Sequence, residues 1–431
     1  MRNNFIISRP KFITNIGQLA LPKPFSDRVP NQPISILENV WVRIENGVIS
    51  EIGPASEPFP NDETKENNFD ANGRLATPGL IDSHTHPVFR GYRQQEFLRR
   101  CKGETYQQIA EAGGGILNSI RGVRNAGEDE LKQSIKGHLD RFLQMGVTTI
   151  EGKSGYGLSV DSEIKSLRAL KDVAMNHPID VSSTLLAAHV IPPEFKANPD
   201  GYVNLICEEI IPLTIEHELA ESIDIFLDDG AFNSTYAKTI FESAQKHNMM
   251  IKMHADQFRM SNGAELAAEY NAISADHMDY TTIDGLALMS KAGVSLNMLP
   301  GAVFFLGLDQ YASGRDAIDC GCNVALSTDF NPGSSPTQSL PMMMTLACLK
   351  MGISADEALW ACTMGGAKVI NRHDSVGALD IGYKADICLW DAPDVAYIPY
   401  SYANIFPDYV IKGGIVMSDH GGLITDNIPS E

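Results

Sequence analysis

Hydrophobic and polar residues alternate along short segments near both ends of the chain, as they do in β-strands. Residues 40–53 alternate around Asn46 and Gly47, the pair favoured in a type I′ hairpin turn. Short β-like runs return at residues 385–393 and 409–417, and two glycines interrupt the second run. Neither end alone supplies enough strands for a covered sheet. We therefore expect residues 1–77 and 366–431 to complete one β-sandwich together.

The central segment, residues 78–365, has a different rhythm, in which short apolar runs alternate with longer helical patterns. Seven apolar runs that end in polar residues predict strands at residues 80–88, 147–155, 181–190, 249–256, 272–279, 293–300 and 322–330. Seven parallel strands in a segment close to the ~250 residues of an eight-stranded βα barrel favour a TIM-like (β/α)8 barrel over an open sheet. We expect the remaining strand near residues 115–121. The predicted fold is thus α/β, a barrel with a small β-sandwich.

The charge balance of the chain is strongly acidic, since 34 lysines and arginines face 54 aspartates and glutamates, for a net charge of −20. Such a surface repels phosphate backbones and anionic membranes, so we expect neither nucleic acid nor a membrane as a partner. A small anionic ligand is also repelled at long range. Its pocket would need an arginine of its own.

Seven cysteines are scattered along the chain, and none forms a CxxC pair. This usage argues against a disulfide framework or a zinc knuckle. The first residues lack the apolar core of a signal peptide, and no stretch reaches the ~18 apolar residues of a membrane span. We therefore predict a cytoplasmic protein.

Histidines and an aspartate stand where predicted strands end. His84 and His86 are two residues apart, so on a strand both imidazoles project from one face and can converge on one ion. His254, His277 and Asp329 end three further apolar runs. Imidazole and carboxylate ligands without thiolates indicate a catalytic zinc or iron site with an open coordination position. The alternative is that the histidines have packing or surface roles and that Asp329 caps a helix.

Several motifs point to one family. The segments TPGLIDSHTHPVF, EGKSGYGL, AAHVIPPE, KMHADQ, NGAELA, SADH, LPG and STDFNPGSSPT occur in this order. In these motifs, from about Thr77 to the end of the chain, the sequence resembles the imidazolonepropionases, a family of the metal-dependent amidohydrolase superfamily. The resemblance implies hydrolysis of 4-imidazolone-5-propanoate to N-formimidoyl-L-glutamate, a step in histidine degradation. It also implies a homodimer.

The resemblance further implies roles for individual residues. One zinc or iron ion per subunit would be held by His84, His86, His254 and Asp329, with His277 beside the ion rather than on it. Contacts to substrate or product are implied for Arg93, Tyr156, His189, Gln257, Asn331, Gly333 and Ser334.

These residue types suit the opening of a cyclic amide. The reaction requires a strong nucleophile at neutral pH, and a bound divalent ion supplies one by lowering the pKa of its water to about 7. Asp329 is suited to accept the proton of that water, and His277 to orient the water or to protonate the departing ring nitrogen, so both are catalytic candidates. The fork of Arg93 can bind the propanoate carboxylate, and Tyr156 can add a hydrogen bond. The alternative partner of Arg93 is Glu96.

Two positions limit this interpretation. Gln257 stands where some relatives carry an acidic residue, and a neutral amide cannot act as a general base, so we expect it only to bind substrate. Lys153 belongs to a GKS triplet that imitates a phosphate-binding loop, but Val147 replaces the required glycine. We expect Lys153 to be structural or to lie beside the metal ligands. Tyr106, on a glycine-rich segment near the site, is expected to lean into the pocket.

Two other functions remain open on sequence grounds. A deaminase of the same superfamily, acting on cytosine-like or guanine-like rings, would use the same ligands but would not need a carboxylate-binding arginine. A metal-free scaffold that keeps the barrel for subunit assembly would require that ligands be lost, and all four are present.

Overall fold

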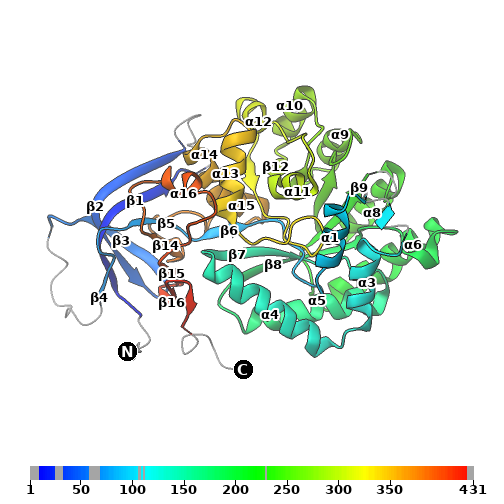
Figure 1. Ribbon diagram of the computed structural model, residues 1–431, viewed down its shortest axis with the longest axis horizontal. Helices are drawn as coiled ribbons and strands as arrows, with labels where there is room; N and C mark the ends of the chain where they lie inside the picture. The colour runs from blue at the N-terminus through cyan, green and yellow to red at the C-terminus, as the bar shows by residue number, and fades with distance from the viewer. Residues whose placement is uncertain are drawn as a thin grey trace.

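The computed structural model describes residues 9–24, 33–57, 68–104, 108–109, 112–228 and 231–424. Its central part is a barrel of eight parallel strands that neighbour one another in chain order (Figure 1). The strands are β6 (Leu80–Asp82), β7 (Val147–Lys153), β8 (Asp180–Ala188), β9 (Ser222–Leu227), β10 (Met250–Ala255), β11 (Ser274–His277), β12 (Ser295–Met298) and β13 (Val324–Leu326). Just beyond the first and last strands, Thr85 pairs with Phe330 in a parallel bridge. The predicted (β/α)8 barrel is confirmed.

Alternation along the barrel strands separates an apolar outer face from a polar interior. In β9, Ile223, Ile225 and Leu227 belong to the large apolar core. The residue between the first two, Asp224, is fully buried and faces the other way, into the barrel. Polar residues at such inward positions meet inside the barrel, and they build the floor of the site described below.

The expectation of a strand near residues 115–121 is wrong. These residues begin helix α3 (Ile116–Asn125), in which Ile120 and Val123 recur at helical spacing on the buried side. The eighth strand is β9, whose first four residues alternate polar and apolar side chains and whose last two are apolar. It lies between two long helical segments.

Helices cover the outside of the barrel (Figure 1). The major ones are α3, α4 (Glu128–Gln144), α5 (Val160–Met175), α8 (Ser234–Lys246), α9 (Gly263–Glu269), α10 (Ile283–Ala292), α12 (Gly314–Asp319) and α13 (Leu340–Lys350). The others are α1 (Gln94–Cys101), η3 (Pro193–Phe195), α11 (Pro300–Leu306) and α16 (Tyr397–Tyr400). Two longer helices each contain a π turn in the middle. The first consists of α6 (Pro199–Leu205), the π turn η4 (Ile206–Ile210) and α7 (Ile211–Glu216). The second consists of α14 (Ala355–Trp360), the π turn η5 (Ala361–Gly365) and α15 (Gly366–Val369). None of the helices in the described ranges has both the length and the apolar character needed to cross a membrane.

The two chain ends form one nine-stranded sheet beside the barrel. From the N-terminal end come β1 (Phe12–Pro22), β2 (Ile34–Glu45), β3 (Val48–Pro54), β4 (Asn68–Asp70) and β5 (Leu75–Pro78), and from the other end β14 (Ile387–Trp390), β15 (Tyr409–Lys412), β16 (Ile415–Asp419) and β17 (Gly422–Leu423). Antiparallel pairing of β5 with β14 joins the two sets. Asn46 and Gly47 both have positive φ in the β2–β3 turn, as a type I′ turn requires. That the termini share one sheet is confirmed, and the division at residues 77 and 365 stays a prediction.

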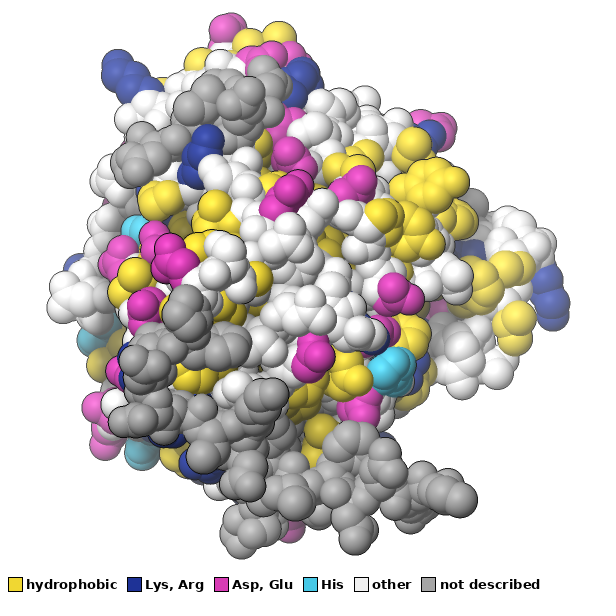
Figure 2. All heavy atoms as spheres, turned by 90° about the vertical axis from the view of Figure 1, so that its left-hand side faces the viewer, with side chains coloured by type: hydrophobic (Ala, Val, Ile, Leu, Met, Phe, Trp, Pro, Cys, Tyr) yellow, Lys and Arg dark blue, Asp and Glu magenta, His cyan; other side chains and the backbone are white. Residues whose placement is uncertain are grey.

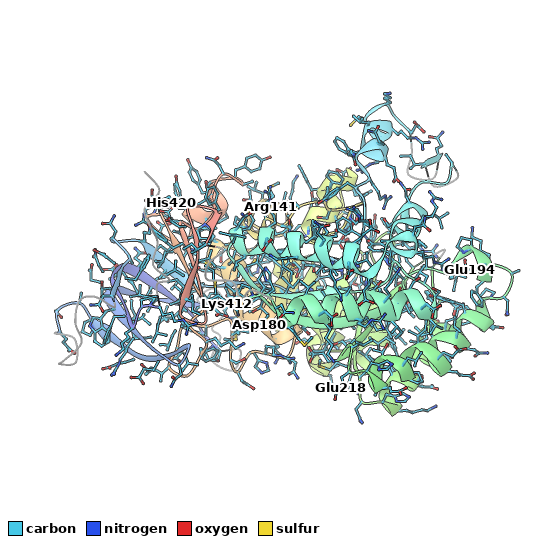
Figure 3. All side chains as sticks on the ribbon, turned by 90° about the horizontal axis from the view of Figure 1, so that it is seen from below. Arg141, Asp180, Glu194, Glu218, Lys412 and His420 are labelled. Carbon is cyan, nitrogen blue, oxygen red and sulfur yellow. The ribbon has the colours of Figure 1, made fainter. Side chains whose placement is uncertain are left out.

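A partly buried ion cluster connects this sheet to the barrel. Lys412 on β15 donates to Asp180 at 2.6 Å and to Asp386 at 2.7 Å. Figure 3 shows Lys412 and Asp180 close together where the sheet meets the barrel. On the outer face of the sheet, acidic side chains are scattered among apolar and uncharged ones (Figure 2).

Candidate active site

The predicted site residues meet at one end of the barrel. A cavity of about 960 Å³ lies over the carboxyl ends of the strands. All of the predicted site residues except His84 line it, namely His86, Arg93, Tyr156, His189, His254, Gln257, His277, Asp329, Asn331, Gly333 and Ser334. His84 is fully buried beneath His86 and His254. The predicted Tyr106 lies outside the described residues.

Four donor atoms converge at the floor of the cavity. The Nε2 atom of His86 lies 3.2 Å from Nε2 of His84, 3.5 Å from Nε2 of His254 and 3.3 Å from Oδ1 of Asp329. Ligand atoms on a tetrahedral zinc ion, with bonds of about 2.0–2.1 Å, lie roughly 3.3 Å apart. The cluster therefore has the donor types and the spacing of a metal site.

Buried carboxylates orient two of these imidazoles. Nδ1 of His84 is 2.5 Å from Asp276, and Nδ1 of His254 is 3.0 Å from Asp224. A carboxylate at Nδ1 favours the tautomer whose proton is on Nδ1, which leaves the Nε2 lone pair for a cation. Burial lowers the pKa of His84 well below its usual value, so the ring is neutral, as a ligand must be.

Lys153 lies inside the barrel beneath these carboxylates. Its Nζ atom is 2.6 Å from Asp224 and 2.8 Å from Glu151, and Lys252 reaches Glu151 at 2.9 Å. All four side chains are fully buried. Lys153 thus lies beside the residues that orient the histidines, as expected.

Asp329 and His277 lie on strained backbone at strand ends, with φ angles of 54° and 72°. Burial raises the pKa of Asp329, but the hydrogen bond from His86 and the charges of the neighbouring imidazoles together lower it by more, so the net pKa is below its usual value. Burial lowers the pKa of His277 to about 3, so this ring is neutral at neutral pH. His277 also lies within 4.8 Å of donor atoms of His84 and His254.

Arg93 pairs with Glu96, the alternative partner, and also lines the cavity. Its Nε and Nη2 atoms donate to one oxygen of Glu96 at 2.9 and 2.7 Å. The guanidinium is thus a wall of the cavity and a member of an ion pair.

Tyr156 and His189 come from neighbouring loops. Their ring centroids are 5.4 Å apart, and the His189 ring stacks on His86 at the same distance. Glu163 accepts hydrogen bonds from the backbone of Gly157 at 2.7 Å and so fixes the loop that carries Tyr156. Burial lowers the pKa of His189 to about 3, so its ring is neutral.

The turn after β13 connects its predicted residues to Asp329. Asn331 accepts from the backbone nitrogens of Gly333 and Ser334 at 2.7 and 2.8 Å. The Ser334 hydroxyl donates to Oδ2 of Asp329 at 3.2 Å. These residues therefore shape the turn and orient the carboxylate, besides lining the cavity together with Gln257.

Comparison with known proteins identifies the chain. The model of the amidohydrolase family matches residues 75–422. An imidazolonepropionase of Geobacillus sp. (strain WCH70) is 43% identical over 423 residues, which cover 96% of this chain and 99% of the relative. That of Geobacillus thermodenitrificans (strain NG80-2) is 44% identical over 98% of this chain and 99% of its own length. The chain belongs to the imidazolonepropionase family.

Solved structures agree with this family at the level of the fold. N-isopropylammelide isopropylaminohydrolase from Burkholderia multivorans aligns with a TM-score of 0.70 at 16% identity, over 96% of this chain and 99% of that one. Atrazine chlorohydrolase from Arthrobacter aurescens TC1, complexed with zinc, aligns with a TM-score of 0.69 at 16% identity, over 96% of both chains.

Sequence reasoning missed residues that hold this imidazolonepropionase site together. Asp224 and Asp276 lie within barrel strands, and Glu163 lies on a helix. For the two aspartates, the available signal was an acidic residue at an inward position of a strand. For Glu163 the sequence contains no comparable signal, because its partners are backbone groups of the preceding loop. Glu96 was considered only as a partner of Arg93, and its contacts with Gly115 and Asn118 were not foreseen.

Proposed function

We propose that the chain hydrolyses 4-imidazolone-5-propanoate to N-formimidoyl-L-glutamate, with one zinc or iron ion per subunit. The observation that carries this proposal is the composition of one cavity. Its walls contain the guanidinium of Arg93, the neutral imidazoles of His189 and His277, and members of the donor cluster. The full-length relatives named imidazolonepropionase support the same activity.

The proposed metal ligands are His84, His86, His254 and Asp329. Their nitrogen and carboxylate atoms suit both zinc and iron. A divalent ion held there would supply Lewis acidity and a water whose pKa is about 7.

Proton transfer is assigned to Asp329 and His277. The Asp329 carboxylate accepts the proton of the attacking water, and Ser334 keeps its other oxygen in place. His277, whose ring is neutral, is assigned to orient that water or to relay its proton from Asp329 to the departing ring nitrogen. Gln257, as an amide, serves only to hydrogen-bond the substrate.

Substrate binding is assigned to the upper walls of the cavity. Arg93 binds the propanoate carboxylate through charge-assisted hydrogen bonds, and the Tyr156 hydroxyl contributes another. The neutral His189 ring hydrogen-bonds the imidazolone. Asn331, Gly333 and Ser334 form the turn against which the substrate lies.

The test is an ultraviolet assay of imidazolonepropanoate disappearance, run before and after chelation and again after zinc or iron is added back. We expect activity to be lost and restored together with about one metal ion per chain. Turnover of cytosine or guanine in place of imidazolonepropanoate would favour the deaminase alternative, and full activity without metal would refute the proposed site.

We further propose that the protein is a cytoplasmic homodimer. The seven cysteines are free in the structure, which suits a reducing compartment. Light scattering of the purified protein tests the dimer, because a monomer mass at micromolar concentration would contradict it.

A further inference from the structure

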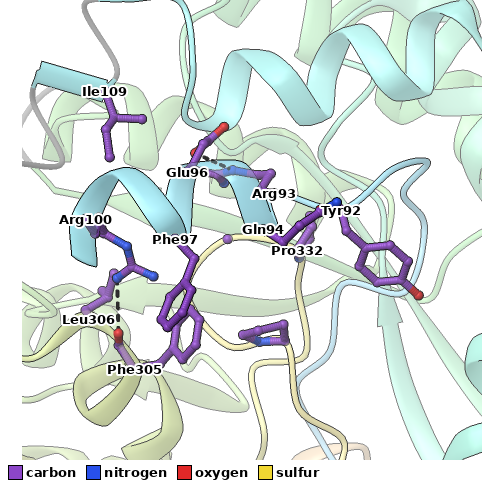
Figure 4. Close-up of a pocket in the computed structure, with 12 residues that line it drawn as sticks. Tyr92, Arg93, Gln94, Glu96, Phe97, Arg100, Ile109, Phe305, Leu306 and Pro332 are labelled. Atoms are coloured by element: carbon purple, nitrogen blue, oxygen red, sulfur yellow. Dashed lines mark hydrogen bonds and ion pairs between the residues drawn. The ribbon is translucent and has the colours of Figure 1, made fainter. Parts of the chain in front are cut away.

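The Glu96 carboxylate holds Arg93 at the edge of the active-site cavity. Arg93 precedes helix α1, and Glu96 lies one turn later on the same helix. Both hydrogen bonds use the Nε and Nη2 edge of the guanidinium (Figure 4). The two side chains are only 10% and 11% exposed, so the pair is largely shielded from water.

Glu96 is itself anchored by a different part of the chain. Its second oxygen accepts from the backbone nitrogen of Gly115 at 3.1 Å and from the Asn118 side chain at 3.3 Å. These groups belong to the start of α3. Because both oxygens of Glu96 are used, the carboxylate has a fixed place, and the guanidinium bound to it has one too.

Gly333 forms the opposite wall of the guanidinium. A Cβ atom at this position would lie 2.1 Å from Nη1 of Arg93 and 2.8 Å from Cζ. The guanidinium therefore lies directly against the backbone of the turn that follows Asp329.

Packing alone does not fix Arg93, because a second cavity lies beside it. This cavity has a volume of about 410 Å³, and its walls are mostly apolar. Phe97, Phe305, Ile109 and Pro332 line it (Figure 4). Arg93 and Gly333 line both this side cavity and the active-site cavity. A long, flexible side chain released from its ion pair would have room to leave the active site.

We propose that Glu96 is a positioning residue that holds the Arg93 guanidinium against Gly333, where it binds the substrate carboxylate. The inference rests on the proposed function. Glu96 opposes an anionic substrate by its charge, but it confines the cation that binds that substrate. Confinement has the larger effect, because an Arg93 that has lost its contact with Glu96 would have to be ordered again each time substrate binds.

Two substitutions separate confinement from charge. Glu96→Leu removes both the charge and the hydrogen-bond acceptors, whereas Glu96→Gln removes the charge but keeps one acceptor for Arg93. We expect Glu96→Leu to raise KM for imidazolonepropanoate about tenfold with kcat within about twofold, as the loss of one charge-assisted contact predicts. Glu96→Gln should recover part of that loss.

A matched control is available in the same chain. Glu357 is 5% exposed on its side chain and binds Arg315 at 3.1 Å, but it lines neither cavity. Glu357→Leu should lower stability as Glu96→Leu does and leave KM unchanged. A neutral imidazolone that lacks the propanoate chain provides the second control, since its kcat/KM should not respond to Glu96→Leu.

Failure of the proposed function and failure of the inference about Glu96 give different results. If the unmodified protein does not turn over imidazolonepropanoate, the proposed function fails. If it does, a lower KM in both Glu96 variants shows that charge dominates and overturns the inference. Equal losses for the neutral and the anionic substrate show a merely structural role and overturn it as well.

Discussion

Removal of the buried Lys153 ammonium should destabilise the protein far more than removal of a surface ammonium whose carboxylate partner lies at a similar distance. The Nζ atom of Lys153 is 2.6 Å from Asp224 and 2.8 Å from Glu151, and none of these side chains is exposed. Lys238 is 2.8 Å from Glu269, but the two side chains are 43% and 53% exposed. The two clusters therefore differ mainly in their access to water.

The expected magnitudes follow from that difference. Lys153→Met keeps the length of the side chain but leaves two carboxylates buried without their closest cation, which costs about 3–5 kcal/mol. Lys238→Met removes a pair that water and salt already screen, so we expect a change of less than about 1 kcal/mol. Metal affinity should also fall in Lys153→Met, since Asp224 orients His254.

The assay is urea unfolding of both variants and the unmodified protein at pH 7, with metal content measured in parallel. Burial lowers the pKa of Lys153, but its carboxylate partners raise it by more, so the net pKa is above its usual value. Its contribution to stability is therefore complete below its unfolded pKa of about 10.4 and persists at pH 7. Burial raises the pKa of Glu151, but Lys153 and Lys252 together lower it by more, so its net pKa is below its usual value. The Lys153→Met deficit should therefore shrink as pH falls below about 4, where Glu151 gains a proton. Equal destabilisation by both variants at pH 7 would refute the reasoning.

Three further changes test other parts of the structure. Burial lowers the pKa of His138 to about 4, so the folded state resists protonation and stability should fall by up to about 3 kcal/mol between pH 6.5 and 4. His138→Gln should remove most of that dependence, measured by urea unfolding at the two pH values. Gly333→Ala places a methyl group on the Arg93 guanidinium and should raise KM about tenfold with little change in kcat; steady-state kinetics decide. Asp276→Asn should weaken metal binding about 10–100-fold in competition with a chelator, and an unchanged affinity would remove Asp276 from the site.

The parts of the fold that sequence predicts well are those marked by local pattern. The run that ends in His254 is apolar except for Lys252, so both the strand and its functional residue are visible from the chain itself. β9 is also mostly apolar, but its one charged residue is Asp224 in mid-strand, which is compatible with an exposed edge strand. Residues 115–121 contain three apolar residues, and only their spacing separates a helix from a strand.

The candidate site shows a similar limit. The strand-end positions of His84, His86 and Asp329 follow from local pattern, because the carboxyl ends of barrel strands meet at one face. The pairing of Asp276 with His84 joins strands 192 residues apart in the chain. Which inward residue meets which depends on barrel closure and strand order, and no local pattern contains that information.

The same closure brings an excess of negative charge into the barrel. Asp276 contacts His84, Asp224 contacts His254, and Asp329 contacts His86. With Glu151 and Asp82 these make five buried carboxylates near the donor cluster, against two buried ammonium groups, Lys153 and Lys252. Burial raises the pKa of Asp82 to about 7, so one carboxylate is partly protonated at neutral pH. Burial lowers the pKa of His84 and His86, so these rings are neutral. A divalent cation at the donor cluster would add the positive charge that the lysines do not supply. The barrel interior and the proposed metal site thus form one electrostatic unit, and metal binding should stabilise the fold as well as serve the reaction.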